Sequence, residues 1–139
     1  MNIKINIKSP PKNYEIHIGE DIFKKIPKDL VKIKRVCQVL LVSNELVYKY
    51  YGEYITEGLI NEGYEVLVYL IPDGEEYKTW HQGEAILSKL LEAGFNRDAL
   101  VVALGGGVIG DLAGFVASIY QRGIDLIHLP TTLLAQVDS

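Results

Sequence analysis

Three consecutive glycines lie in a segment whose composition suits phosphate binding. Residues 105–110 match the pattern G-x-G-x-x-G, and Asp111 follows directly. An apolar stretch of strand length (99–104) precedes them, and an apolar stretch of helical length (108–120) follows. Helix N-termini offer unpaired N–H groups and a positive dipole end, and glycine lets a phosphate approach the backbone closely. The segment is a candidate cradle for a pyrophosphate; the alternative is a tight turn that binds nothing.

The place of this glycine run differs from the common dinucleotide-binding fingerprint. That fingerprint follows the first strand of its fold, and an acidic residue at the end of the next strand holds the ribose. Here at least three predicted strands precede the run, and the next strand has Asp125 at its beginning and His128 near its end. The loop suits a pyrophosphate, but the rest of a dinucleotide must be held differently.

Two other polar segments follow predicted strands. Residues 72–78 lie after one strand, where open α/β sheets bind ligands. Carboxylates there can accept hydrogen bonds from ribose hydroxyls, and Lys78 can supply a positive charge. Thr131 and Thr132 follow another strand and lie beside the glycine run if the two strands are neighbours. The alternative interpretations are a solvated loop that leads into a helix at Thr79 and a simple helix N-cap.

Alternating strands and helices must position these segments. Short apolar runs predict strands covered on both faces, and stretches of helical period separate them. The predicted strands are residues 36–42, 64–71, 99–104 and 124–129, and the predicted helices begin near residues 43, 79, 108 and 130. This order predicts an α/β fold with a mainly parallel sheet flanked by helices. Residues 1–8 and 14–18 alternate apolar and polar, which predicts an N-terminal antiparallel ribbon with one buried face.

Local signals predict the ends and the faces of the helices. Gly63 and Gly94 stand where helix C-termini favour a positive φ. Thr79 with Gln82 three residues later fits a capping box. Residues 108–120 are apolar nearly all round, which predicts a central helix. We expect two buried helical stripes, one of Leu46, Val47, Tyr50, Tyr54, Ile55 and Leu59 and one of Ile86, Leu87, Leu90 and Leu91.

Composition limits the class of protein. The chain has 139 residues, 48% of them apolar, which suits one domain with a real core. Its formal net charge of -4 gives no electrostatic basis for binding nucleic acid or an anionic membrane. No apolar stretch approaches the length of a membrane span, and the N-terminus does not read as a signal peptide. The single cysteine, Cys37, lies in a predicted strand, where we expect it to be buried, and favours a cytoplasmic setting.

Taken together, several blocks of the chain resemble 3-dehydroquinate synthase. The similarity covers essentially the whole chain and is densest from Pro72 onward. Its blocks are PDGEEYK (72–78), LEAGFNRD (91–98), ALGGGVIGDLAGF (103–115), YQRG (120–123) and PTTLLAQVDS (130–139). The resemblance implies a Rossmann-like, NAD-binding N-terminal domain over residues 1–139, cut off before the helical metal-binding domain of the family.

The resemblance also implies roles for individual residues. Arg122 and Asp138 match residues that touch substrate, and the family's Arg reaches across a homodimer interface toward the substrate phosphate. The chain departs from some relatives at Val42, where they carry an acidic residue. The positions that match NAD contacts or lie in the same segments are Asn44, Asp73, Gly74, Glu75, Glu76, Tyr77, Lys78, Gly106, Gly107, Val108, Ile109, Gly110, Asp111, Thr131 and Thr132.

The family's reaction uses NAD as a transient oxidant. The substrate is 3-deoxy-arabino-heptulosonate 7-phosphate, which loses phosphate and recloses as 3-dehydroquinate in the shikimate pathway. A divalent metal, zinc or cobalt, is held by one Glu and two His of the second domain, which this sequence lacks. The histidines present, His17, His81 and His128, have no metal-ligand spacing. We therefore expect no metal site and no catalytic residue in this chain, and no activity from it alone.

Three alternatives remain open at the level of sequence. Related sugar-phosphate cyclases make deoxy-inosose or valiolone-type rings with the same NAD chemistry. A metal-dependent glycerol or polyol dehydrogenase would share the fold and a glycine loop but would release NADH. The third alternative is a nucleotide-binding module without catalysis.

Overall fold

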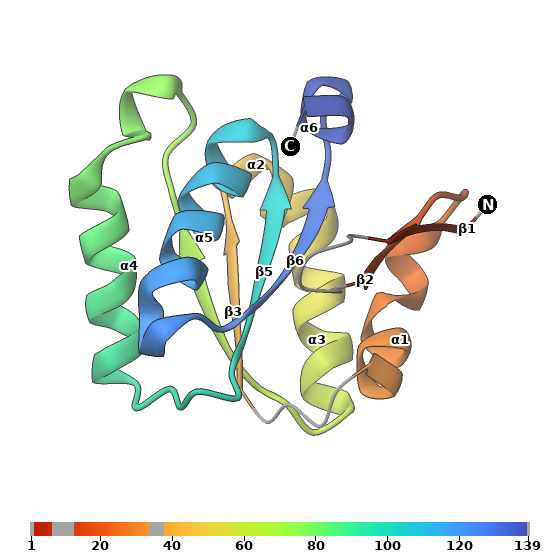
Figure 1. Ribbon diagram of the computed structural model, residues 1–139, viewed down its shortest axis with the longest axis horizontal. Coiled ribbons are helices and arrows are strands. Elements are labelled where there is room, and N and C mark those ends of the chain that lie inside the picture. The colour runs from red at the N-terminus through yellow and green to blue at the C-terminus, as the bar shows by residue number, and fades with distance from the viewer. Residues whose placement is uncertain (1, 7–12, 34–37, 139) are drawn as a thin grey trace.

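The computed structural model describes residues 2–6, 13–33 and 38–138. Its centre is a four-stranded parallel sheet with the order β4-β3-β5-β6. The strands are β3 (Gln38–Ser43), β4 (Glu65–Leu70), β5 (Leu100–Gly105) and β6 (Asp125–Pro130). The predicted mainly parallel α/β sheet is therefore confirmed, and all four carboxyl ends lie at the upper edge in Figure 1.

Helices cover both faces of this sheet (Figure 1). On one face, α4 (Trp80–Glu92) and α5 (Gly107–Ile119) cover Leu40, Val42 and Val101. On the other face, α1 (Ile26–Ile33) and α3 (Glu53–Asn61) cover Leu41 and Val102. Successive residues of one strand enter opposite cores because side chains alternate along a strand. The predicted central position of α5 is confirmed, since it contacts β5, β6 and α4.

The helix predicted after residue 43 departs from its expected form. It consists of α2 (Glu45–Val47), a π-helical turn η2 (Tyr48–Gly52) and α3. Ile55 and Leu59 are buried as expected, whereas Leu46, Tyr50 and Tyr54 are more than half exposed. That part of the predicted stripe is wrong. The π turn adds a residue and so changes the face on which Tyr50 and Tyr54 lie, whereas Leu46 precedes the turn. Leu91 of the second stripe is also exposed, although Ile86 and Leu90 are buried.

Other local signals are confirmed in part. Gly63 and Gly94 have positive φ angles of 92° and 67° at the ends of their helices. The Thr79 hydroxyl accepts a hydrogen bond from the Gln82 N–H at 3.3 Å, as an N-cap does. The reciprocal half of the capping box is wrong, because the Gln82 Oε1 accepts from the Tyr69 hydroxyl instead.

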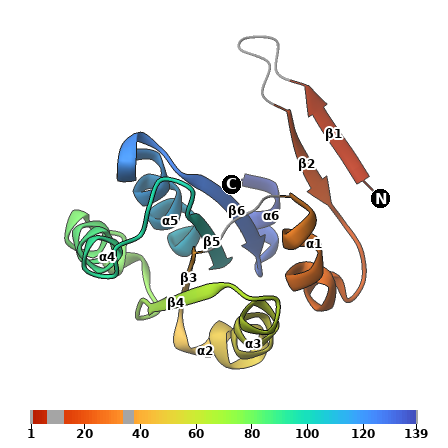
Figure 2. The same cartoon turned by 90° about the horizontal axis from the view of Figure 1, so that it is seen from below.

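The N-terminal ribbon is formed by β1 (Asn2–Asn6) and β2 (Asn13–His17), which pair antiparallel as predicted. Figure 2 shows it extending away from the sheet. The expected burial of its apolar face is wrong for β2, because Tyr14 is 51% exposed and Ile16 is 37% exposed. The described chain also contains helix α6 (Leu133–Asp138) and three short 3-10 turns. These turns are η1 (Ile22–Lys25), η3 (Glu75–Tyr77) and η4 (Tyr120–Arg122).

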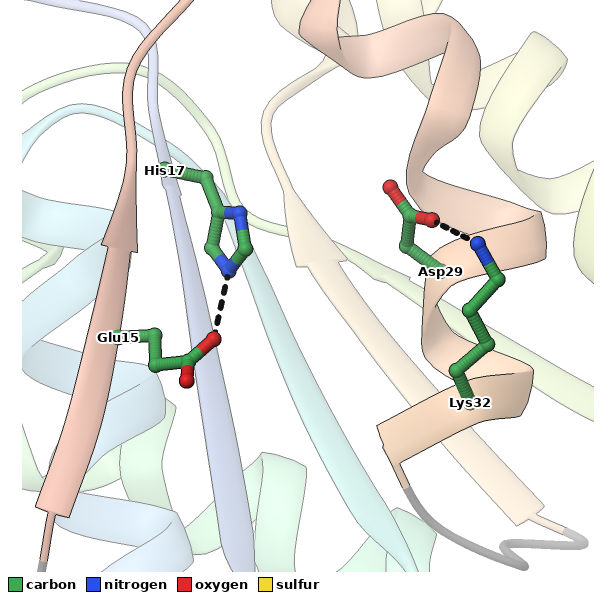
Figure 3. A network of polar contacts seen from close by, with 4 residues as sticks. All are labelled: Glu15, His17, Asp29 and Lys32. Atoms are coloured by element: carbon green, nitrogen blue, oxygen red, sulfur yellow. Dashed lines mark hydrogen bonds and ion pairs between the residues drawn. The ribbon is translucent and has the colours of Figure 1, made fainter. Parts of the chain in front are cut away.

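Polar contacts lie on the surface where the ribbon approaches α1 (Figure 3). His17 Nε2 is 3.4 Å from Glu15 Oε2 within β2, and Lys32 Nζ donates to Asp29 Oδ1 at 2.9 Å within α1. The hydrogen bond from Lys32 lowers the pKa of the Asp29 carboxyl. These exposed pairs contribute little to stability.

Cys37 and His128 were both expected in buried strands. Cys37 lies outside the described residues. His128 is exposed, because β6 is an edge strand whose solvent face is open, so its expected place in a buried strand is wrong.

Within the described residues, no helix combines the length and apolar character needed to cross a membrane.

Candidate functional site

The sheet changes direction between β3 and β5. The chain runs from β3 outward to β4, then crosses back so that β5 lies on the other side of β3. Loops on the two sides of such a switch point leave in opposite directions and open a crevice at the carboxyl ends. The glycine loop follows β5 and Asn44 follows β3, so both border this point. The glycine loop thus lies at the crevice even though it does not follow the first strand of the sheet.

The three glycines of the loop have different surroundings. Gly105 ends β5, and a Cβ there would lie 2.7 Å from Cγ1 of Ile109. A Cβ on Gly106 would lie 3.3 Å from Cγ2 of Thr132, whereas a Cβ on Gly107 would have nothing within 4 Å. Gly105 and Gly106 therefore allow close contact within the protein, and Gly107 borders open space.

Helix α5 begins at Gly107 with the N-cap Gly106, which forms no side-chain capping bond. The Gly110 N–H donates to the Gly106 carbonyl at 3.0 Å and closes the first turn. The N–H groups of Gly107 and Val108 precede that turn and are the amides that a helix N-terminus offers to an anion. Because a Cβ on Gly107 would meet no atom within 4 Å, this residue leaves space for an anion beside these amides.

The loop after β4 reaches across to α5. Gly74 has a φ of 132°, a conformation that favours glycine, and the turn η3 follows it. Lys78 then forms an ion pair with Asp111 in the first turns of α5. The hydrogen bond and the charge of Asp111 raise the pKa of the Lys78 ammonium above its usual value. A shallow pocket of about 250 Å³ lies beside this pair, lined by Lys78, Thr79, Trp80, Asp111, Leu112 and Phe115.

Asn44 connects the ends of β3 and β4. Its side-chain oxygen accepts from the Val47 N–H at 2.8 Å, so Asn44 is the N-cap of α2. Its Nδ2 donates to Asp73 Oδ1 at 3.3 Å. Asn44 is only 9% exposed, so its side-chain amide is held within the protein at the carboxyl end of β3.

Thr131 and Thr132 lie beside the glycine loop, as predicted for neighbouring strands. The Thr131 N–H donates to the Gly105 carbonyl at 3.0 Å. The Thr132 hydroxyl accepts from the Ala135 N–H at 3.1 Å, so it is the N-cap of α6. The Thr132 hydroxyl therefore caps a helix, as the structural alternative predicts, and its proton stays available to a ligand. Its methyl group lies beside Gly106 of the glycine loop.

Five further candidate residues lie after the carboxyl ends of the strands, as the glycine loop does. Glu75, Glu76 and Tyr77 form η3, next to Lys78. Ile109 lies in the first turn of α5 and is buried. Asp138 is exposed at the end of α6, which contacts α5 and β6.

Arg122 is not brought to this site. It precedes β6 and therefore lies at the amino edge of the sheet, opposite the glycine loop. Its φ of 70° and that of Gln121, 49°, are both left-handed, which is uncommon for non-glycine residues. The turn holds an exposed guanidinium at this edge. Within one chain, Arg122 and the glycine loop cannot contact the same small ligand.

Sequence reasoning missed two relationships at this site. The ion pair between Lys78 and Asp111 joins the loop after β4 to helix α5. The hydroxyl of Ser43, which is completely buried, donates to the Leu104 carbonyl at 2.7 Å. The available signal was a hydroxyl at the end of the otherwise apolar run Val39 to Val42.

The site has the chemistry to hold a dinucleotide but offers no metal centre. Amides at the start of α5, carboxylates of the loop after β4 and the ammonium of Lys78 suit phosphates and ribose hydroxyls. Among the residues that the structure describes, no three His, Cys, Asp or Glu side chains are grouped so that they could hold a metal ion. His17, His81 and His128 lie on β2, on the first turn of α4 and on β6.

Comparison with known proteins shows the family of the chain. The family model described as 3-dehydroquinate synthase N-terminal matches residues 68–139. The 3-dehydroquinate synthase of Thermodesulfovibrio yellowstonii is 46% identical over 136 residues, which cover 98% of this chain. Those residues cover 38% of that relative, so the chain spans well under half of its length.

Solved structures share the fold. A 2-deoxy-scyllo-inosose synthase complexed with carbaglucose-6-phosphate, NAD+ and Co2+ superposes with a TM-score of 0.85 at 29% identity, over 99% of this chain and 36% of that one. The 2-epi-5-epi-valiolone synthase of Streptomyces hygroscopicus subsp. jinggangensis, with NAD+ and Zn2+ bound, has a TM-score of 0.69 at 27% identity, over 82% of this chain and 32% of that one. The fold is therefore the Rossmann-like fold of these cyclases.

Proposed function

The chain belongs to the 3-dehydroquinate synthase family, and on that premise we propose that it is the NAD-binding N-terminal domain of a 3-dehydroquinate synthase. The complete enzyme would convert 3-deoxy-arabino-heptulosonate 7-phosphate to 3-dehydroquinate and phosphate in the cytoplasm. When bound, NAD would supply transient oxidation of a substrate alcohol. The residues of this chain would bind and orient it.

The glycine loop at the switch point supports this proposal most directly. Its amides at Gly107 and Val108 precede the first closed turn of α5, and a Cβ at Gly107 would meet nothing within 4 Å. Open space beside uncapped amides leaves room for a pyrophosphate. The glycine loop would therefore hold the two phosphates.

Neighbouring segments would hold the rest of the dinucleotide. Glu75 and Lys78 lie on the loop after β4, where a carboxylate can accept from ribose hydroxyls and an ammonium can contact a polar group. Asn44 at the bottom of the crevice would face the adenosine side. Position 42 is a buried valine in this chain, whereas some relatives carry an acidic residue there. The chain therefore offers no carboxylate at this position.

The remaining parts of the enzyme would come from outside this chain. We propose that a helical second domain, in the part of the relatives that this chain does not match, holds a divalent zinc or cobalt ion. Arg122, at the edge opposite the glycine loop, would serve the substrate site of a partner subunit in a homodimer. The chain alone would then release no phosphate from the substrate. The identity of 46% to a 3-dehydroquinate synthase, against 29% and 27% to the other cyclases, favours this substrate.

NAD titration of the chain tests the proposal. Trp80 is the single tryptophan and lines the pocket beside Lys78 and Asp111, so its fluorescence should change when NAD binds. Gly107→Val should weaken NAD binding by about tenfold or more, because its side chain would displace hydrogen bonds to a charged ligand. Gly114→Ala is the matched control on the same helix, where an added Cβ meets only Leu126 at 3.7 Å.

Four results would contradict the proposal. The first two are a wild-type chain that does not bind NAD and a Gly107→Val variant with unchanged affinity. The third is steady formation of NADH from an alcohol, which would indicate a dehydrogenase. The fourth is phosphate release by the chain alone, which would contradict the assignment of the chemistry to a second domain.

A further inference from the structure

Ser43 ends β3 with a hydroxyl that no solvent reaches. The side chain is 0% exposed, and Oγ donates to the Leu104 carbonyl at 2.7 Å. Leu104 directly precedes the glycine loop, and 61 positions separate the two residues in sequence. A buried hydroxyl at the end of an apolar strand is costly without such a partner, so this bond is the reason that serine is tolerated here.

The bond lies where the ladder between β3 and β5 stops. The two strands pair from Val39 with Leu100 up to Val42 with Ala103. Ser43 and Leu104 are the next residues in that register. The two strands part beyond this point because their loops turn to opposite sides of the sheet. The Ser43 side chain therefore continues the connection by one more step, at the base of the crevice.

Neighbouring strands hold the start of the glycine loop from both sides. On the β3 side, the Ser43 hydroxyl binds the Leu104 carbonyl, while the Ser43 carbonyl accepts from the Ile71 N–H at 2.8 Å. On the β6 side, the Thr131 N–H binds the Gly105 carbonyl at 3.0 Å. The two carbonyls immediately before Gly106 are thus both fixed.

We propose that Ser43 is a positioning residue for the cofactor phosphates: its hydroxyl fixes the height and direction at which β5 enters the glycine loop. The inference rests on the proposed function. Removing the hydroxyl would leave the Leu104 carbonyl without its donor in a place that solvent does not reach. The loop would then shift or fluctuate, and its amides would no longer converge on one pyrophosphate.

Tyr120 provides a matched control for a merely structural role. Its hydroxyl is also buried and donates to the backbone carbonyl of Phe95 at 2.6 Å, with the Leu90 carbonyl as a second, longer acceptor at 3.3 Å. It lies at the amino edge of the sheet, away from the glycine loop. Ser43→Ala and Tyr120→Phe therefore each delete a buried hydroxyl-to-carbonyl bond, and both should destabilise the chain.

The test measures NAD affinity and amide hydrogen exchange in the 139-residue chain, with urea unfolding to compare stabilities. Ser43→Ala should weaken NAD binding by about tenfold, the size expected for a buried group left unpaired, and Tyr120→Phe should leave affinity unchanged. Without NAD, exchange at the Gly110 and Thr131 amides, which donate to the Gly106 and Gly105 carbonyls, should quicken in Ser43→Ala only. Ser43→Cys, with a weak donor of similar shape, should have an intermediate effect and is the variant to use if Ser43→Ala does not fold.

The outcomes separate this inference from the proposed function. If the wild-type chain binds no NAD, the proposed function fails, and the exchange measurement alone decides whether Ser43 orders the loop. If the wild-type chain binds NAD but Ser43→Ala binds it equally well, the role of Ser43 is overturned. Equal quickening of loop exchange in Ser43→Ala and Tyr120→Phe would also overturn it, because the effect would then reflect general stability.

Discussion

Lys78, on the loop after β4, forms an ion pair with Asp111 on α5 and so bridges the mouth of the crevice. The two side chains are 44% and 50% exposed, which places the pair at the surface. Surface pairs contribute little to stability because water and salt screen them. The more important consequence concerns binding, since the pair brings an ammonium and a carboxylate together at the edge of the pocket.

The Lys78–Asp111 pair should contribute to stability in a pH-dependent way. The pKa of Lys78 is raised in the folded chain by Asp111, so the stabilisation is fully present below the ordinary lysine value of 10.5. It is lost as the pH rises through the higher folded value. Urea unfolding of wild type and Lys78→Met at pH 8 and above pH 10.5 should therefore show a small difference that shrinks at the higher pH.

A control for this prediction is Lys89→Met, which removes another exposed, ion-paired lysine. Lys89 pairs with Glu92 at 3.1 Å within α4, away from the crevice. Lys78→Met should also weaken NAD binding, whereas Lys89→Met should not. A stability difference between Lys78→Met and wild type that stays constant over this pH range would show that the ion pair is not its cause.

Gly105 and Gly107 should respond differently to the same substitution. Gly105→Ala would force a methyl group to within 2.7 Å of Ile109 in a buried strand end, so it should destabilise the chain by about 1–3 kcal/mol. Gly107→Ala adds a methyl group to open space at the start of a helix and should be neutral or stabilising by less than about 1 kcal/mol. Urea unfolding of the two variants provides the measurement, and equal stabilities would refute the different roles given to these glycines.

Removing the N-cap of α4 should destabilise the helix that carries Trp80. Thr79→Ala deletes the acceptor of the Gln82 N–H and should cost about 1 kcal/mol, as is typical of N-cap losses. Thr79→Ser keeps the hydroxyl and should retain most of the stability. Thermal unfolding would compare the three proteins, and a Thr79→Ser variant as unstable as Thr79→Ala would mean that the methyl group, rather than the cap, is important.

The sheet could be predicted from sequence because its strands are short apolar runs separated by helical periods. The grouping of Asn44, residues 72–78, the glycine loop and Thr131 at one edge follows from parallel strands, and the structure confirms it. The order of the strands in the sheet was not predictable. The same alternation of strands and helices would also fit a sheet in which β5 does not lie beside β3. Only the order explains why a loop after β5 lies at the switch point.

Errors arose where a local pattern had more than one structural solution. The π turn at Tyr48–Gly52 rotates Tyr50 and Tyr54 into solvent, and a period-3.6 stripe cannot reveal one inserted residue. In the ribbon, alternation correctly predicted strands, but alternation does not say what covers Tyr14 and Ile16. The bonds of Ser43 and Lys78 join distant segments, so no local pattern could identify their partners, although the hydroxyl at the end of an apolar run marked Ser43 itself.

The switch point has a consequence for the kinetics of folding. Because every strand of the sheet is parallel to its neighbours, no hairpin can assemble the crevice from adjacent residues. The bonds from Ser43 to Leu104 and from Thr131 to Gly105 join different strands of the sheet, and the first spans 61 positions of sequence. The binding site can therefore form only after nearly the entire chain has collapsed. Recovery of cofactor affinity during refolding should thus lag behind helix formation, and it would report the completion of the whole sheet.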